Sequence, residues 1–201
     1  MRFSGIEKKE LAIAGLLISL AFAVLLSGGY RVFLAPSFAV LFVFAGAFFT
    51  AGLGFLLHEL MHKFVAQSYG YLAEFRAYYP GLFFGLGLSF FGFIIAAPGA
   101  VHIRSYNRPI TRERSGKISI AGPLSNIFLA VVFLILLLFV GGEGLWKTFF
   151  SYGLSINSLL AAFNLIPVRP FDGEAVKNWN MGFYVLVVIL AVGLFALSWF
   201  L

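Results

Sequence analysis

The sequence predicts an all-α polytopic membrane protein with about five transmembrane helices and a short membrane-associated β or re-entrant element. Hydrophobic residues make up 61% of the 201 residues, whereas a soluble domain is usually about 45–50% apolar. Five apolar segments are also long enough to cross a bilayer, since a spanning helix needs roughly 20 residues. They cover residues 10–27, 36–66, 117–140, 148–166 and 181–201. We therefore expect a single integral-membrane domain over residues 1–201.

The first two segments need more than their length to be interpreted. Residues 10–27 look like the apolar part of a signal peptide, but no convincing small-x-small cleavage signal follows and more spans do. They are therefore predicted to be a retained span. Residues 36–66 are too long for one straight crossing, which predicts a helix that tilts or projects into the aqueous phase.

The region between the second and third segments, about residues 71–104, has a different pattern. Its apolar centre, residues 80–97, contains four glycines and is bracketed by prolines, which disfavours a plain helix. Short strands, or a loop that enters the membrane against protein, fit this composition better. The flanking stretches "YLAEFRAYY" and "GAVHIRSY" mix β-branched and aromatic residues, and this mixture favours strands.

The charge pattern predicts the orientation of the chain. The net charge is +6 at pH 7, with 14 lysines and arginines. If the N-terminus lies in the cytoplasm, all of these except Arg31 and Lys147 fall on the cytoplasmic side, as the positive-inside rule favours. We therefore expect a multi-pass protein of the cell membrane with a cytoplasmic N-terminus. No basic surface interleaved with aromatic residues is visible, so no nucleic-acid partner is expected.

The stretch "HELMH" places His58, Glu59 and His62 near the cytoplasmic end of the second segment. Charged groups inside a membrane cost about 2.5–3.5 kcal/mol each on insertion scales, so such a cluster is expected to have a function. Residues four apart share one helical face, which lets two imidazoles bind one cation. Glu59 can then act as a general base on a metal-activated water. The alternative is two histidines at a membrane boundary beside an unrelated glutamate.

A catalytic zinc needs a third protein ligand and one open position. The chain has no cysteine, which excludes a thiolate, and Glu143 falls on the other side of the membrane. Four candidates remain: His102, Glu74, Asp172 and Glu174. Asp172 is favoured because it follows a span that ends on the same side, in the proline-containing turn "NLIPVRPFDG". Alternatively, Asp172 begins a turn or caps the last helix.

Three stretches together resemble the site-2 protease family of intramembrane zinc metalloproteases. They are "HELMH", "NLIPVRPFDG", which matches the family's Asn-x-x-Pro-x-x-x-x-Asp-Gly pattern, and "ISIAGPLSN", which is similar to its Ala-Gly-Pro-x-x-Asn pattern. Their order agrees with the family, and the match covers roughly residues 36–173. PDZ-like and CBS domains of larger relatives are not seen in this sequence.

The resemblance implies one Zn²⁺ per chain, bound by His58, His62 and Asp172. It also implies that Glu59 is the catalytic base and that Asn164 orients or polarises the substrate carbonyl. The glycine, proline and asparagine of "AGPLSN" would shape a close helix approach near the site. The region of residues 71–104 would hold an unwound substrate segment.

These expectations describe a zinc-dependent intramembrane endopeptidase whose partners are the lipid bilayer and a transmembrane protein substrate. One alternative is a transporter, in which His58 and His62 bind a cation in transit, but no internal repeat is visible and the ionisable cluster lies in one leaflet. The other is an inactive scaffold, against which the intact Glu59 argues. Nothing in the sequence specifies the substrate or the oligomeric state.

Overall fold

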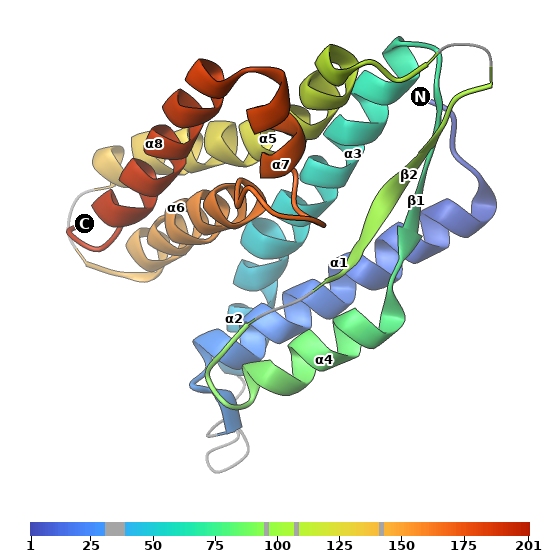
Figure 1. Cartoon of the computed structure of the whole chain (residues 1–201). Helices are drawn as coiled ribbons and strands as arrows, with labels where there is room; N and C mark the ends of the chain where they lie inside the picture. Colours follow the sequence, from blue (N-terminus) through green and yellow to red (C-terminus); the bar gives the residue numbers. More distant parts are fainter. Residues whose placement is uncertain (31–38, 95–96, 107–108, 141–142) are drawn as a thin grey trace. The chain divides into compact units, whose positions relative to one another are not determined.

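The structure is a computed structural model that describes residues 1–30, 39–94, 97–106, 109–140 and 143–201. It is mostly helical, with one small sheet (Figure 1). The chain separates into two compact units. The first comprises Met1–Leu56 and Glu74–His102, and the second comprises Leu57–Ala73 and Ile103–Leu201.

The first unit is built around α1 (Gly5–Leu26), whose N-terminus is capped by the Ser4 hydroxyl accepting from the Glu7 N–H. Helix α1 packs against the first half of a long second helix. That helix begins with α2 (Ala39–Ala47) and continues through the π-helical turn η2 (Phe48–Gly52) into α3 (Leu53–Ser68). A Cβ at Gly52 would collide with the Ser19 side chain, so small residues set how closely these helices approach.

The expectation of strands or a re-entrant loop over residues 80–97 is wrong for residues 79–89. They form helix α4 (Tyr79–Ser89). The buried positions Gly81, Leu82, Gly85 and Ser89 share one face, and α4 packs against α1. A Cβ at Gly81 would lie only 2.6 Å from the Tyr78 ring. Close packing of this face outweighs a helix penalty of about 1 kcal/mol per glycine. Residues 95–96 of the predicted element lie outside the described residues.

The flanks of α4 form the two strands that the sequence predicts. Strands β1 (Leu72–Ala77) and β2 (Gly99–Arg104) make a two-stranded sheet. The Tyr78 N–H donates to the Pro98 carbonyl at 3.0 Å, so the end of β1 lies beside the start of β2 and the strands run antiparallel.

Carboxylates of α1 bind the backbone of β1. Glu7 Oε1 accepts from the Phe75 N–H at 2.9 Å, and Glu10 Oε2 accepts from the Ala77 N–H at 3.0 Å. Because alternate N–H groups of a strand point to the same edge, these two contacts occupy one edge of β1. Glu7 is fully buried, so its carboxylate is retained in the interior by this pairing.

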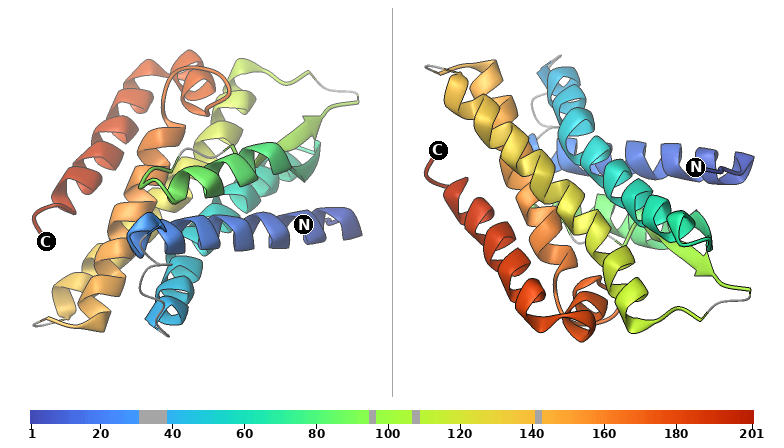
Figure 2. Two further views of the ribbon diagram at one scale, coloured as in Figure 1. Left: turned by 90° about the horizontal axis from the view of Figure 1, so that it is seen from below. Right: turned by 90° about the horizontal axis from the view of Figure 1, so that it is seen from above.

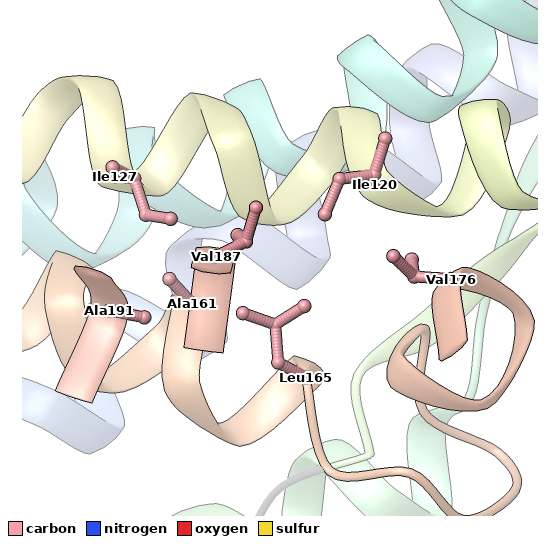
Figure 3. Packing of buried hydrophobic residues seen from close by; sticks show 7 residues of the cluster. All are labelled: Ile120, Ile127, Ala161, Leu165, Val176, Val187 and Ala191. Carbon is pink, nitrogen blue, oxygen red and sulfur yellow. The ribbon is translucent and has the colours of Figure 1, made fainter. Parts of the chain in front are cut away.

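Among its described residues after 103, the second unit contains four helices: α5 (Arg112–Phe139), α6 (Leu145–Asn164), α7 (Gly173–Trp179) and α8 (Met181–Leu197). Helices α5, α6 and α8 run alongside one another (Figure 2). Their shared core is aliphatic (Figure 3), and it consists of Ile120, Ile127, Ala161, Leu165, Val176, Val187 and Ala191. This core fixes the end of α6, and therefore the loop that leaves it.

Three described helices are long and apolar enough to cross a membrane: Gly5–Leu26, Val40–Ser68 and Arg112–Phe139. They correspond to the first three predicted spans, although residues 36–38 lie outside the described part of the chain. The predicted spans at 148–166 and 181–201 correspond to α6 and α8, and α8 is an apolar helix of fewer than 18 residues. Five spans are therefore not confirmed, and a single domain over residues 1–201 stays a prediction.

Candidate metal centre

Helix α3 carries the "HELMH" stretch, and its residues His58, Glu59 and His62 are all buried. One helical turn separates the two histidines, which places both rings on the same face. Their Nε2 atoms lie 3.0 Å apart, and the ring planes are nearly perpendicular at 82°. The helix therefore aims two imidazole nitrogens at one point.

Asp172 reaches the same point from the loop between α6 and α7. Its Oδ2 lies 3.3 Å from His58 Nε2 and 3.2 Å from His62 Nε2. The loop can fold back onto the end of α6 because residue 173 is glycine. A Cβ at Gly173 would lie 2.7 Å from the Ile166 carbonyl oxygen and closer still to that of Leu165. Asp172 directly precedes α7, but its side chain makes no capping hydrogen bond there.

Helix α5 holds the other nitrogen of each histidine. His62 Nδ1 is 2.8 Å from the Ile118 carbonyl oxygen, and His58 Nδ1 is 2.7 Å from Asn126 Oδ1. A backbone carbonyl can only accept, so His62 carries a proton on Nδ1, and Nε2 is the ring nitrogen available to bind a metal. The amide oxygen of Asn126 imposes the same tautomer on His58.

Gly122 lets α5 come this close to the histidines. A Cβ at this position would lie 2.6 Å from His58 Nε2 and even nearer to His62 Nε2. The next residue, Pro123, is also buried within α5. The tight helix approach expected for the "AGPLSN" stretch is therefore present in the second unit, and Gly122 faces the two histidine Nε2 atoms.

The three converging atoms fit a zinc ion in both chemistry and spacing. With the protons of the histidines on Nδ1, the two Nε2 atoms and the Asp172 oxygen could all donate lone pairs to one cation held among them. Tetrahedral zinc with ligands at about 2.0–2.1 Å separates neighbouring ligand atoms by roughly 3.3 Å. The observed separations are 3.0, 3.2 and 3.3 Å. Three protein ligands leave the fourth position for water or substrate, as in catalytic zinc sites.

The electrostatic setting keeps Asp172 in its ligating form. Burial alone would raise the pKa of this carboxyl group, but the His62 and His58 rings, when they carry a positive charge, hold its pKa below the ordinary value, and a metal cation bound between them would act in the same direction. Glu59 interacts electrostatically with the same three residues. It follows His58 directly along α3, so the one carboxylate of the "HELMH" stretch lies beside the proposed metal position rather than in it.

Asn164 lies at the end of α6, eight residues before Asp172. It is half-buried, and its Nδ2 donates to the Leu160 carbonyl oxygen at 2.9 Å. The amide is thus held against its own helix. A role in orienting the substrate carbonyl stays a prediction.

The other candidates for a third ligand have different surroundings. His102 is exposed on β2. Glu74 accepts from the Ser4 hydroxyl and pairs with Arg76, and Glu174 pairs with Arg169 at 2.9 Å. Within the described ranges, the group of histidine and acidic side chains whose ligand atoms converge is His58, His62 and Asp172.

Sequence reasoning missed a fully buried residue behind this site. Asn157 lies on α6, and its Oδ1 accepts from Asn126 Nδ2 at 3.1 Å. A primary amide in the middle of an apolar helix is a signal that could have been noticed, because a polar group at such a position needs a partner. The contact between the Ile118 carbonyl and His62 could not be predicted from the sequence, because every residue has a backbone carbonyl.

Comparison with known proteins places the chain in a family. A protein of Methanocaldococcus jannaschii is 41% identical over 201 residues, which cover 98% of each chain, and its name is "Putative zinc metalloprotease". This chain belongs to the same family. A Bacillus subtilis protein that also bears the name "Putative zinc metalloprotease" is 32% identical over 139 residues, which cover 59% of this chain and 61% of the relative. No family model matches the chain, and no solved structure gives a significant match.

Proposed function

We propose that this protein is a zinc-dependent intramembrane endopeptidase of the site-2 protease type. The observation that carries the proposal is the convergence of His58, His62 and Asp172 on one point, with Glu59 beside it. The two relatives named as zinc metalloproteases support the same metal and the same reaction class.

In this proposal His58, His62 and Asp172 hold the ion, and Glu59 performs the proton transfers. Bound zinc would supply Lewis-acid polarisation and make water a better nucleophile near neutral pH. The Glu59 carboxylate accepts a proton from the attacking water as the water oxygen bonds to the peptide carbonyl carbon. When the C–N bond breaks, Glu59 returns that proton to the leaving amine nitrogen. Asn164 would bind the substrate carbonyl and orient it.

The apolar helix that carries the site supports action within the membrane. Val40–Ser68 is one of the helices able to span a bilayer, and it ends less than two turns after His62. A site near the end of a span suits a substrate that is itself a transmembrane segment. The basic residues expected on the cytoplasmic side support placing the site toward that leaflet.

The small sheet is the proposed holder of the substrate. A helical segment cannot be cleaved while its carbonyls remain hydrogen-bonded within the helix, so it must be extended first. Glu7 and Glu10 already occupy one edge of β1, and β2 occupies the other. An extended substrate that adds to this sheet would therefore pair with β2.

The test is Glu59→Gln, which is nearly isosteric but cannot accept the proton. We expect the purified variant to retain about one zinc per chain and to lose about 10²–10⁴-fold in turnover of a transmembrane peptide in detergent or lipid. Wild-type cleavage by this variant would refute the mechanism. In cells, the same variant should trap uncleaved substrates, and comparing its membrane proteome with that of wild type would identify them.

A further inference from the structure

Two asparagines behind the metal centre form a buried chain of hydrogen bonds across three helices. His58 on α3 contacts Asn126 on α5, which in turn contacts Asn157 on α6. Asn126 and Asn157 are both completely buried. Buried amides are retained in an apolar interior only when they are hydrogen-bonded, and these two are bonded to each other in line with a metal-facing histidine.

The direction of every bond in this chain is determined by its far end. Asn157 Nδ2 lies 2.9 Å from the Gly153 carbonyl oxygen, one turn back on α6. Because that carbonyl can only accept, the Asn157 NH₂ group faces it and Oδ1 faces Asn126. Asn126 must therefore present Nδ2 to Asn157, at 3.1 Å, and Oδ1 to His58, at 2.7 Å.

The reverse orientation would prevent His58 from binding a metal. If the Asn126 amide turned over, its NH₂ group would face His58 Nδ1, which would then have to accept. The proton of His58 would move to Nε2, the nitrogen that faces Asp172 and His62. In the same step two amide oxygens, from Asn126 and Asn157, would face each other.

We propose that Asn157 is a positioning residue that fixes the metal-binding tautomer of His58 through the amide of Asn126. His62 needs no such chain, since a backbone carbonyl fixes its tautomer directly. Asn157 itself touches neither metal nor substrate. This inference rests on the proposed zinc site and adds a residue from a third helix to it.

The decisive variant is Asn157→Ser. A serine in a helix can still donate to the carbonyl four residues back, as Ser158 does to Leu154 at 2.7 Å. This serine is too short to reach Asn126, so the hydrogen bond to Asn126 is lost while the Gly153 carbonyl of α6 keeps a donor. We expect zinc binding, measured by competition with a chelator, to weaken by about 10-fold, at the low end of the 10–100-fold effects of residues behind metal ligands. Ser158→Ala is the matched control, since Ser158 is equally buried and its hydroxyl donates to the Leu154 and Ser155 carbonyls of α6 itself. Its zinc affinity should equal that of wild type.

A second substitution distinguishes the loss of side-chain orientation at position 126 from a packing defect at position 157. Adding Asn126→Asp to Asn157→Ser replaces the amide with a carboxylate, whose two oxygens both accept, so it cannot be turned the wrong way for His58. Zinc affinity should recover toward the wild-type value. A packing defect at position 157 would not be repaired by this change.

The outcomes are distinct. Wild-type zinc affinity in Asn157→Ser, or weakened affinity without rescue, would overturn the role of Asn157. Failure of the wild-type protein itself to bind zinc would refute the proposed function instead. Unfolding temperatures of the metal-free variants report whether each one has folded.

Discussion

Replacing Gly122 with alanine should damage the metal centre while leaving the helix that carries it intact. Helix propensity alone predicts a gain of roughly 0.5–1 kcal/mol in stability, because glycine is a poor helix former. The new Cβ, however, would lie 2.6 Å from His58 Nε2, whereas ordinary contacts begin at 3.4 Å. Since His62 Nε2 is nearer still, helix α5 would have to retreat by about 0.8 Å or more, or the histidines would have to rotate.

Either response weakens metal binding. Helix α5 carries both partners of the histidine Nδ1 atoms, so a retreat of 0.8 Å would lengthen those contacts from 2.7 and 2.8 Å to about 3.5 and 3.6 Å. Those distances are too long for useful hydrogen bonds. We expect zinc affinity to fall by about 10–100-fold, which corresponds to roughly 1.4–2.7 kcal/mol. Peptide cleavage should fall by about 10²-fold, since such displacements misplace the reacting groups.

The assay is zinc competition with a chelator, together with thermal unfolding with and without zinc. The metal-free variant should unfold near the wild-type temperature, because the histidines can rotate away when no ion holds them. Zinc should raise that temperature less than it does in wild type. Gly193→Ala is the matched control, since this position lies on α8 and a Cβ there meets nothing within 4 Å. Unchanged zinc affinity in Gly122→Ala would refute the reasoning.

Two further predictions concern the third ligand and the orientation of the chain. Asp172→Ala should lower bound zinc and abolish cleavage together, whereas Glu174→Ala should keep about one zinc per chain in elemental analysis of the purified variants, because Glu174 pairs with Arg169 instead. Full zinc in Asp172→Ala with loss in Glu174→Ala would reassign the ligand. In this cysteine-free chain, an impermeant thiol reagent on intact cells should label Lys147→Cys and spare Arg112→Cys. The opposite labelling pattern would reverse the proposed topology.

The convergence of His58, His62 and Asp172 was more predictable from sequence than the packing of the apolar helices. The four-residue spacing of His58 and His62 is a property of any helix, and Asp172 follows a helix that the apolar pattern already indicates. The strands around α4 were likewise visible in their β-branched and aromatic residues. Such signals are local, so a single sequence contains them.

The failures arise where tertiary packing decides the outcome. Helix α4 forms despite its glycines because its buried face packs against α1 and Gly81 leaves room for the Tyr78 ring, and no local preference reports those contacts. Asn157 escaped notice because its importance depends on a partner 31 positions away. The five predicted spans are not confirmed, because apolar length does not distinguish a helix that crosses the membrane from one that packs within the protein.

The π-helical turn η2 accommodates one extra residue in the long second helix. A regular α-helix advances about 100° per residue, and a π turn contains one residue more than the α-helical turn it replaces. The extra residue is therefore absorbed in the wide turn itself, and the helix leaves η2 nearly in the phase of an uninterrupted α-helix. Removing a single residue from Phe48–Gly52 would restore a regular helix and leave the direction of the following residues nearly unchanged, whereas removing one residue from α3 before His58 would turn the two histidines by about 100° relative to the preceding turns. A change of one residue in the length of this helix is thus expected to be tolerated at η2 and not in the regular helix that follows it.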